Sequence, residues 1–131
     1  MKLITLLTIN AILATLHGLG FVLLPGVMLD FYGVASSPGA LIMGQLFGCH
    51  LLALGVLSWT ARQDADSRPN MPVIWASLVS NPVGTVLVFW AIQKGSFGPM
   101  GWLGVAIYAG LGLGYWAALR GVKRSAAFAA A

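Results

Sequence analysis

The sequence predicts an all-α integral membrane protein: an up-down-up-down bundle of four transmembrane helices with both termini in the cytoplasm. Two observations carry this prediction. Four apolar runs cover residues 3–24, 41–61, 72–92 and 101–119, and each has about the 20 residues that a helix needs to cross the hydrocarbon core of a bilayer. Basic residues also collect on one side of these runs, and such an asymmetry orients membrane helices.

The distribution of positive charge gives the orientation. In a chain with four spans, the N-terminus, the connection between the second and third spans, and the C-terminus lie on the same side. These three places hold six basic residues: Lys2, Arg62, Arg68, Arg120, Lys123 and Arg124. The opposite side holds only Lys94, so the positive-inside rule places both termini in the cytoplasm.

The composition indicates a single membrane domain over residues 1–131. The chain is 59% hydrophobic and 8% charged, which is too little charge to cover the surface of a soluble domain. The net charge of +4 is spread over membrane boundaries, where it meets anionic lipid head groups. Because no basic stripe is interleaved with aromatic residues, lipids are expected as partners and nucleic acid is not. A single cysteine, Cys49, excludes disulfides within the chain and CxxC redox chemistry.

The elements follow in order along the chain. The first run is too long for a signal-peptide core and ends without a small-x-small cleavage site, so it is expected to stay as the first membrane helix. The connection 25–40 has a short apolar-aromatic stretch between two Pro-Gly pairs, which favours about one helical turn along the outer membrane surface. The connection 62–71 is a charged turn and 93–100 a tight one, so consecutive helices should be antiparallel neighbours.

Tryptophans support these boundaries. All five fall near the ends of the predicted spans, where aromatic belts form at the two membrane interfaces. The cytoplasmic ends hold Trp59, Trp75 and Trp116, and the outer ends hold Trp90 and Trp102.

Small residues mark the predicted packing faces. In the second span, Gly44, Gly48 and Gly55 fall within about 60° of one another on a helix, and Gly44-xxx-Gly48 is a close-approach motif. The fourth span has two small faces. One consists of Ala106, Gly110, Gly114 and Ala117, and the other of Gly101, Gly104 and Gly112. One face is enough to close the bundle, so Gly110 and Gly114 are candidate contacts with a partner subunit.

The polar residues inside the spans limit the chemistry. No acidic or basic residue lies in the middle of a span, whereas ion-coupled transporters and proton pumps need embedded carboxylates. The sequence also lacks the residue sets for hydrolysis or metal catalysis, so neither catalytic residues nor a protein metal site is predicted.

Two histidines and an asparagine are the candidate cofactor-binding residues. His17 and His50 should lie about 10 and 14 Å from the outer ends of the first two spans, at similar depths. Neutral imidazole is a good axial ligand for haem iron or chlorin magnesium. The alternative is that both histidines hydrogen-bond to Gln45, Asn81 or backbone carbonyls. Asn81 precedes Pro82, which should kink the third span and leave a polar notch there.

The residues around the second span also resemble a known family. Pro25, Tyr32-Gly33, Phe47-Gly48, Leu54-Gly55, Trp59 and Trp102 match the pattern of small bacterial four-span proteins of unknown function, DoxX-like in size and layout. The resemblance implies a four-helix bundle in a bacterial inner membrane and implies no activity. Where that family has an arginine at the head of the second helix, this chain has Gln45.

Two functions remain open. The missing catalytic groups and the two small faces favour a non-catalytic accessory subunit of a larger membrane complex, respiratory or photosynthetic, with other integral membrane subunits as partners. The alternative is a binding protein for a lipid-soluble cofactor (haem, a chlorin pigment or a quinone), with His17, His50 and Asn81 at its site.

Overall fold

The protein is described by a computed structural model that covers residues 2–63, 65 and 69–129, with side chains described as far as residue 121. Arg68 and the side chains of Lys123 and Arg124, which entered the orientation argument, lie outside this part. The described chain forms five helices: α1 (Leu3–Leu23), α2 (Pro25–Phe31), α3 (Pro38–Ala61), α4 (Met71–Gln93) and α5 (Gly101–Ala129).

Among the described residues, α1, α3, α4 and α5 are long and apolar enough to cross a membrane. The prediction of an all-α protein with four candidate membrane spans is therefore confirmed. The helix ends differ from the predicted ones where local chemistry extends a helix. Pro38 stands in the first turn of α3, and Ser37 caps it by accepting a hydrogen bond from the Ala40 N–H at 3.1 Å. As a result, α3 begins before its apolar run does.

The outer connection contains more helix than the one predicted turn. Pro25 begins α2, and Gly33 ends it with a φ of 69°, while the Val34 N–H donates to the Leu29 carbonyl at 2.9 Å. Gly95, with a φ of 71°, ends α4 in the same way. A left-handed residue just after a helix favours glycine because glycine has no Cβ.

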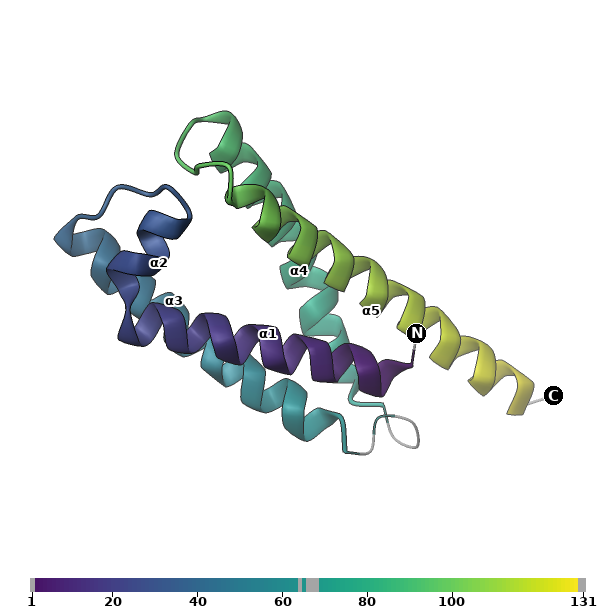
Figure 1. Cartoon of the computed structure of the whole chain (residues 1–131). Coiled ribbons are helices and arrows are strands. Elements are labelled where there is room, and N and C mark those ends of the chain that lie inside the picture. The colour runs from purple at the N-terminus through teal and green to yellow at the C-terminus, as the bar shows by residue number, and fades with distance from the viewer. Residues whose placement is uncertain (1, 64, 66–68, 130–131) are drawn as a thin grey trace.

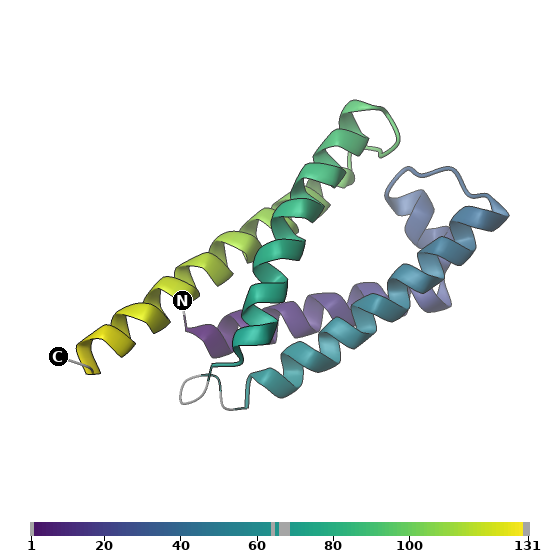
Figure 2. The same ribbon diagram turned by 180° about the vertical axis from the view of Figure 1, so that it is seen from behind.

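The four long helices form two antiparallel pairs rather than one closed bundle. α1 packs mainly on α3 and α4 mainly on α5, and contacts between the two pairs are few. Figures 1 and 2 show the pairs lying close near the N-terminal end of α1 and diverging along their length. The short helix α2 folds back beside the end of α1, where Met28 packs on Gly20.

Glycines explain why each pair is close. A Cβ added to Gly48 would lie 2.8 Å from the Gly18 carbonyl oxygen, and one added to Gly18 would lie 2.9 Å from the Leu52 nitrogen. In the other pair, a Cβ on Gly101 would lie 2.8 Å from Ile92. Small residues allow two helix backbones to approach in this way. Between the pairs, such an approach is seen where Gly33 lies against Gly98 in the outer connections.

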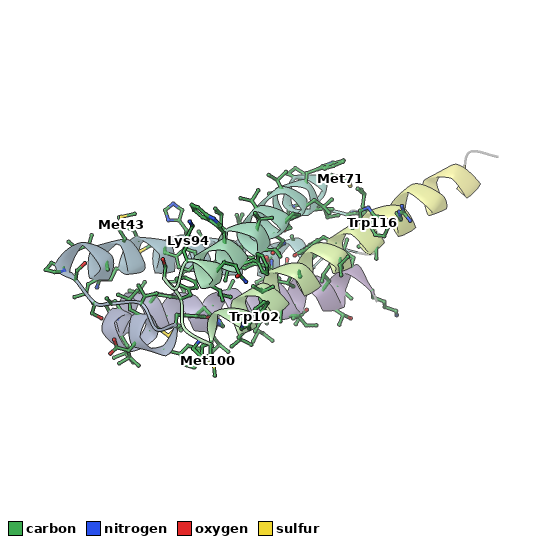
Figure 3. All side chains as sticks on the ribbon, turned by 90° about the horizontal axis from the view of Figure 1, so that it is seen from above. Met43, Met71, Lys94, Met100, Trp102 and Trp116 are labelled. Carbon is green, nitrogen blue, oxygen red and sulfur yellow. The ribbon has the colours of Figure 1, made fainter. Side chains whose placement is uncertain are left out.

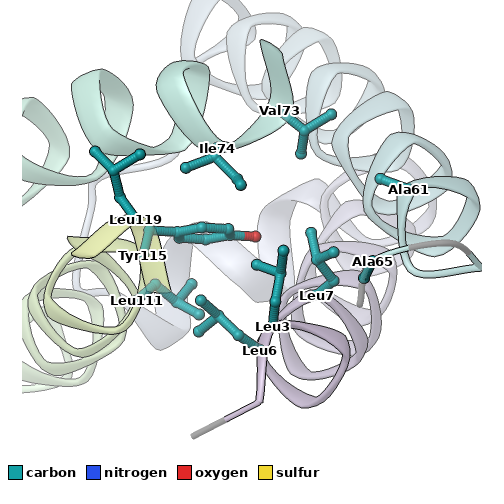
Figure 4. Close-up of a cluster of buried hydrophobic side chains, with 10 residues drawn as sticks. All are labelled: Leu3, Leu6, Leu7, Ala61, Ala65, Val73, Ile74, Leu111, Tyr115 and Leu119. Carbon is teal, nitrogen blue, oxygen red and sulfur yellow. The ribbon is translucent and has the colours of Figure 1, made fainter. Parts of the chain in front are cut away.

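The two pairs meet in a buried cluster at one end of the molecule (Figure 4). Tyr115 of α5 is fully buried, and its ring reaches between Ile74 and Leu111 toward Leu3 and Leu7 of α1. The Asn10 amide, also buried, donates to Ser58 Oγ at 2.9 Å and to the Tyr115 hydroxyl at 3.0 Å. We call Asn10, Ser58 and Tyr115 the polar node, because these side chains connect α1, α3 and α5.

Cations stack on tryptophans at the helix ends. The Arg62 guanidinium lies 3.4 Å from the centre of the Trp59 ring, and that of Arg120 lies 3.5 Å from Trp116. At the other end of the α4–α5 pair, the Lys94 ammonium lies 5.8 Å from Trp90. Figure 3 shows Lys94 and Trp116 far apart along this pair. Aromatic rings and cations placed in this way are typical of the two membrane interfaces.

Candidate ligand-binding cavity

A cavity of about 460 Å³ lies between the two helix pairs. Its wall is mostly apolar, with side chains from α1, α3, α4, α5 and the two outer connections. The apolar lining includes Leu13, Phe21, Phe47, Leu51, Leu54, Leu87, Val88, Phe97, Ile107 and Leu111. The polar lining consists of Asn10, His17, Tyr32, His50, Ser80, Asn81 and Tyr108. A pocket of this size with few polar groups is typical of sites for small lipid-soluble molecules.

The structure brings the three candidate cofactor-binding residues to this cavity. His17 comes from α1, His50 from α3 and Asn81 from α4, and all three line its wall. Phe21, which stacks on Tyr32 at 6.2 Å and meets Phe47 edge-on at 5.3 Å, closes the wall beside them. Each pair of helices therefore supplies polar groups to one shared apolar space.

Both ring nitrogens of His17 have partners. Nδ1 lies 3.0 Å from the Leu13 carbonyl oxygen, and Nε2 lies 3.1 Å from the Tyr32 hydroxyl. A carbonyl can only accept, so the proton stands on Nδ1 and Nε2 is the acceptor. The Tyr32 hydroxyl accordingly donates to Nε2, and a metal ion could use this nitrogen only by displacing Tyr32.

His50 has a hydrogen-bond partner at only one of its ring nitrogens among the described residues. Its Nδ1 lies 2.8 Å from the Leu46 carbonyl oxygen, which again places the proton on Nδ1. Its Nε2 forms no hydrogen bond with any of the residues that the structure describes. The ring is exposed and lines the cavity, so this nitrogen has a lone pair available to a ligand.

The alternative prediction for the histidines is hydrogen bonding to Gln45, Asn81 or backbone carbonyls. Their Nδ1 atoms do bond to backbone carbonyls, one turn earlier in their own helices. Gln45 instead donates to the Val22 carbonyl at 3.2 Å and so connects α3 to α1. The sequence pattern does not predict the hydrogen bond between His17 and Tyr32.

Asn81 lies at the bend of α4, beside Pro82. Pro82 has no N–H for the carbonyl one turn earlier, and Figure 2 shows α4 changing direction near its middle. The Asn81 side chain donates to the Ser77 carbonyl at 2.8 Å, and Thr85 donates to the Asn81 carbonyl at 2.8 Å. These bonds lie on either side of the bend, and Asn81 lines the cavity wall.

Tyr32 and Tyr108 are cavity residues that the sequence did not identify. Burial raises the pKa of the Tyr32 hydroxyl above its ordinary value, and the nearby Tyr108 adds to the rise, so Tyr32 stays a donor at neutral pH. The chain direction turns at Leu24, which has a φ of −133° and a ψ of 54°. That reversal returns Tyr32 to α1, and no periodicity in the sequence signals it.

The glycines singled out by their spacing lie on different kinds of surface. Gly44, Gly48 and Gly55 are buried on the face of α3 that packs on α1. On α5, the inner face holds Gly101, Gly104 and Gly112, while Gly110 is exposed and a Cβ added there would meet nothing within 4 Å. Gly114 is half-buried.

Within the described residues, no three His, Cys, Asp or Glu side chains lie close enough together to hold a metal ion. Comparison with known proteins gives no further guide, because no protein-family model, curated protein or solved structure matches this chain. The resemblance to the DoxX-like group therefore stays a prediction.

Proposed function

We propose that the chain binds a small lipid-soluble molecule in the cavity between its two helix pairs. The observation that carries the proposal is the joint lining of one apolar cavity of about 460 Å³ by His17, His50 and Asn81. Binding cavities for small molecules span roughly 300–1,000 Å³ and combine apolar walls with a few polar groups. No residue set for catalysis was identified in the sequence, so the proposed role is binding.

The hydrogen bonds of the two histidines limit which ring nitrogens could ligate a cofactor metal. His17 is occupied at both nitrogens, whereas Nε2 of His50 has a free lone pair among the described contacts. This supports at most one axial imidazole for a haem or a chlorin, since neutral imidazole binds metal through an unprotonated nitrogen. A ligand without a metal would meet the same nitrogen as a hydrogen-bond acceptor.

The membrane arrangement is part of the proposal. The spans α1, α3, α4 and α5 would cross a bacterial inner membrane with both termini in the cytoplasm, because Lys94 is the only basic residue on the opposite side in the sequence.

Thiol labelling in whole cells tests this orientation. In a Cys49→Ser background, a membrane-impermeant maleimide should label Ser96→Cys, between α4 and α5, but not Gln63→Cys, after α3, until the cells are permeabilised. The reverse labelling pattern would overturn the orientation.

Filling the cavity tests the binding role. Leu54 of α3 lines the cavity and Leu57, one turn further on, does not, so Leu54→Trp and Leu57→Trp form a matched pair. Pyrene serves as the probe because it is apolar and fused-ringed. At about ten times its Kd, a bound ligand stabilises the native state by about 1.4 kcal/mol, which raises the Tm of a protein of this size by several degrees.

We expect pyrene to raise the Tm of the detergent-solubilised protein and of Leu57→Trp, and to leave that of Leu54→Trp unchanged. Equal shifts in both variants would mean that pyrene binds outside the cavity. No shift in the unmodified protein would count against the binding role.

The accessory-subunit role is the second candidate, and one observation favours it. Ala106, Gly110 and Ala117 form an exposed row of small side chains on α5, on the side away from α4. Such a row allows another helix to approach closely. Native-gel migration of mildly solubilised membranes tests it: migration with a large complex would support the role, and migration as a monomer or dimer would reject it.

A further inference from the structure

The two cavity histidines share the same kind of Nδ1 hydrogen bond but differ at Nε2. Each donates its Nδ1 proton to the carbonyl one turn earlier, Leu13 for His17 and Leu46 for His50. Each therefore presents an Nε2 lone pair. The protein satisfies that of His17 with the Tyr32 hydroxyl at 3.1 Å, and no described residue does the same for His50.

The surroundings of His50 make a free acceptor costly. Its neighbours in the wall include Phe47, Leu51 and Leu54, and α3 is one of the helices apolar enough to cross a membrane. His50 is exposed on α3, so in the proposed membrane-spanning arrangement it would meet the cavity or lipid rather than bulk water. A polar atom without a partner in an apolar medium carries a substantial free-energy penalty. A ligand that donates a hydrogen bond to Nε2 would remove the penalty.

The chemistry of the wall defines the donor. A carbonyl-only ligand can accept but not donate, so it leaves Nε2 unsatisfied. A cationic amine would need a counter-charge, and the cavity lining contains no acidic residue among those described. A neutral hydroxyl meets both requirements, and its oxygen can still accept from the Tyr108 hydroxyl, which also lines the cavity.

We propose that the cavity selects a lipid-soluble molecule with a hydroxyl group, a phenol or an alcohol, which donates a hydrogen bond to Nε2 of His50. This inference rests on the proposed binding function and adds the class of ligand and the residue that recognises it. His50 acts here as a specificity residue.

Two probes that differ by one methyl group test it. The first, 1-hydroxypyrene, has a donor hydroxyl, and 1-methoxypyrene has the same ring system without the donor proton. We expect the hydroxyl probe to bind the purified protein in detergent about three- to tenfold more tightly at neutral pH, the ratio that one hydrogen bond supplies. His50→Leu should abolish this preference by weakening only the hydroxyl probe, and His50→Gln, which keeps an acceptor, should restore part of it.

Cys49→Leu is the control, because Cys49 is an exposed neighbour on α3 that does not line the cavity. It should keep the full preference. Equal affinity for the two probes, or a preference that survives in His50→Leu, would overturn the hydroxyl inference while the binding function stands. Failure of both probes and of pyrene to bind would overturn the binding function itself.

Discussion

The hydroxyl of Tyr32 orients the ring of His17. It donates to Nε2 of His17 at 3.1 Å, while the Tyr32 ring stacks on Phe21 at 6.2 Å and lies at a tilt to Phe97 at 5.9 Å. Burial raises its pKa, so the donor proton is retained at every physiological pH. Together with the Nδ1 contact to the Leu13 carbonyl oxygen, this bond orients the ring of His17, which lines the cavity.

Tyr32 should make stability depend on pH in the alkaline range. Its pKa is raised in the native state above the value of 10.0 for an unperturbed tyrosine. Its contribution is therefore fully present below about pH 10 and is lost as the pH rises through the native pKa. We expect the Tm of the unmodified protein to fall more than that of Tyr32→Phe between about pH 9 and 11. Tyr108 and Tyr115 are present in both proteins, so parallel pH profiles would contradict the assignment.

At neutral pH, Tyr32→Phe should lower the free energy of unfolding by about 1 kcal/mol, because Nε2 of His17 loses its hydrogen-bond donor.

Single residues show what the sequence could and could not reveal about the site. His17, His50 and Asn81 are candidates because polar residues are rare inside apolar runs. Their hydrogen-bond states were not predictable from spacing, since the partner of His17 lies beyond a chain reversal at Leu24. The same limit applied to Tyr108, which lines the cavity from α5 as an aromatic residue among glycines.

At the scale of elements, the close packing of α1 on α3 rests on glycines. A Cβ on Gly48 would approach the Gly18 carbonyl oxygen to 2.8 Å and Phe21 Cβ to 2.9 Å. A backbone atom cannot move aside as the end of a side chain can. A larger residue at this position would have to separate the two helices, and so weaken one wall of the cavity.

The variants Gly48→Leu and Gly110→Leu put the same side chain on a tight face and on an open one. Gly48→Leu should lower stability by about 1–3 kcal/mol, the usual cost of overpacking, in a thermal or denaturant unfolding experiment in detergent. Gly110→Leu should leave the stability of the isolated chain nearly unchanged, because a Cβ there meets nothing within 4 Å. Equal destabilisation by both variants would show that the α1–α3 contact at Gly48 is packed no more tightly than the open face at Gly110.

Gly110→Leu also tests the accessory-subunit role. If the small face of α5 contacts a partner subunit, this variant should lose the large complex on a native gel while the isolated chain stays folded. Persistence of the complex in both Gly110→Leu and Gly114→Leu would show that this face is not a subunit contact.

The helices themselves were the most predictable part of the molecule. Twenty-residue apolar runs leave few alternatives in a bilayer, because every backbone group must be bonded within the segment. The observed helices differ from the predicted ones where a capping residue sets the helix end, as Ser37 does before α3, and in the outer connection that forms α2. Glycine spacing identified the face of α3 that packs on α1, yet the fourth span had two small faces and the sequence could not rank them.

At the scale of the whole molecule, the two helix pairs are connected at both ends of the cavity. At one end, the polar node joins α1, α3 and α5. At the other, the Gly98 N–H donates to the Tyr32 carbonyl at 2.7 Å, and Gly33 lies against Gly98. We call Tyr32, Gly33 and Gly98 the loop contact. The sequence predicted one closed bundle because short connections usually give one, whereas packing within each pair dominates over packing between pairs.

The loop contact should set the distance between the two pairs at the far end of the cavity, and two glycines allow a controlled test. Gly33 and Gly95 have nearly the same positive φ, 69° and 71°, so alanine introduces the same backbone strain at each, about 1 kcal/mol. A Cβ on Gly33 would also lie 2.8 Å from the backbone of Gly98, whereas one on Gly95 would meet nothing within 4 Å. Only Gly33→Ala should therefore separate the loops.

Spin labels on Ser36→Cys and Ser96→Cys, in a Cys49→Ser background, place one reporter on each side of the loop contact. Double electron–electron resonance should give a longer and broader distance distribution in Gly33→Ala than in Gly95→Ala, because loss of the contact leaves the polar node as the main tie between the pairs. Indistinguishable distributions would mean that the buried cluster around Tyr115 alone fixes how far the pairs diverge. In that case the width of the cavity would be set from one end only.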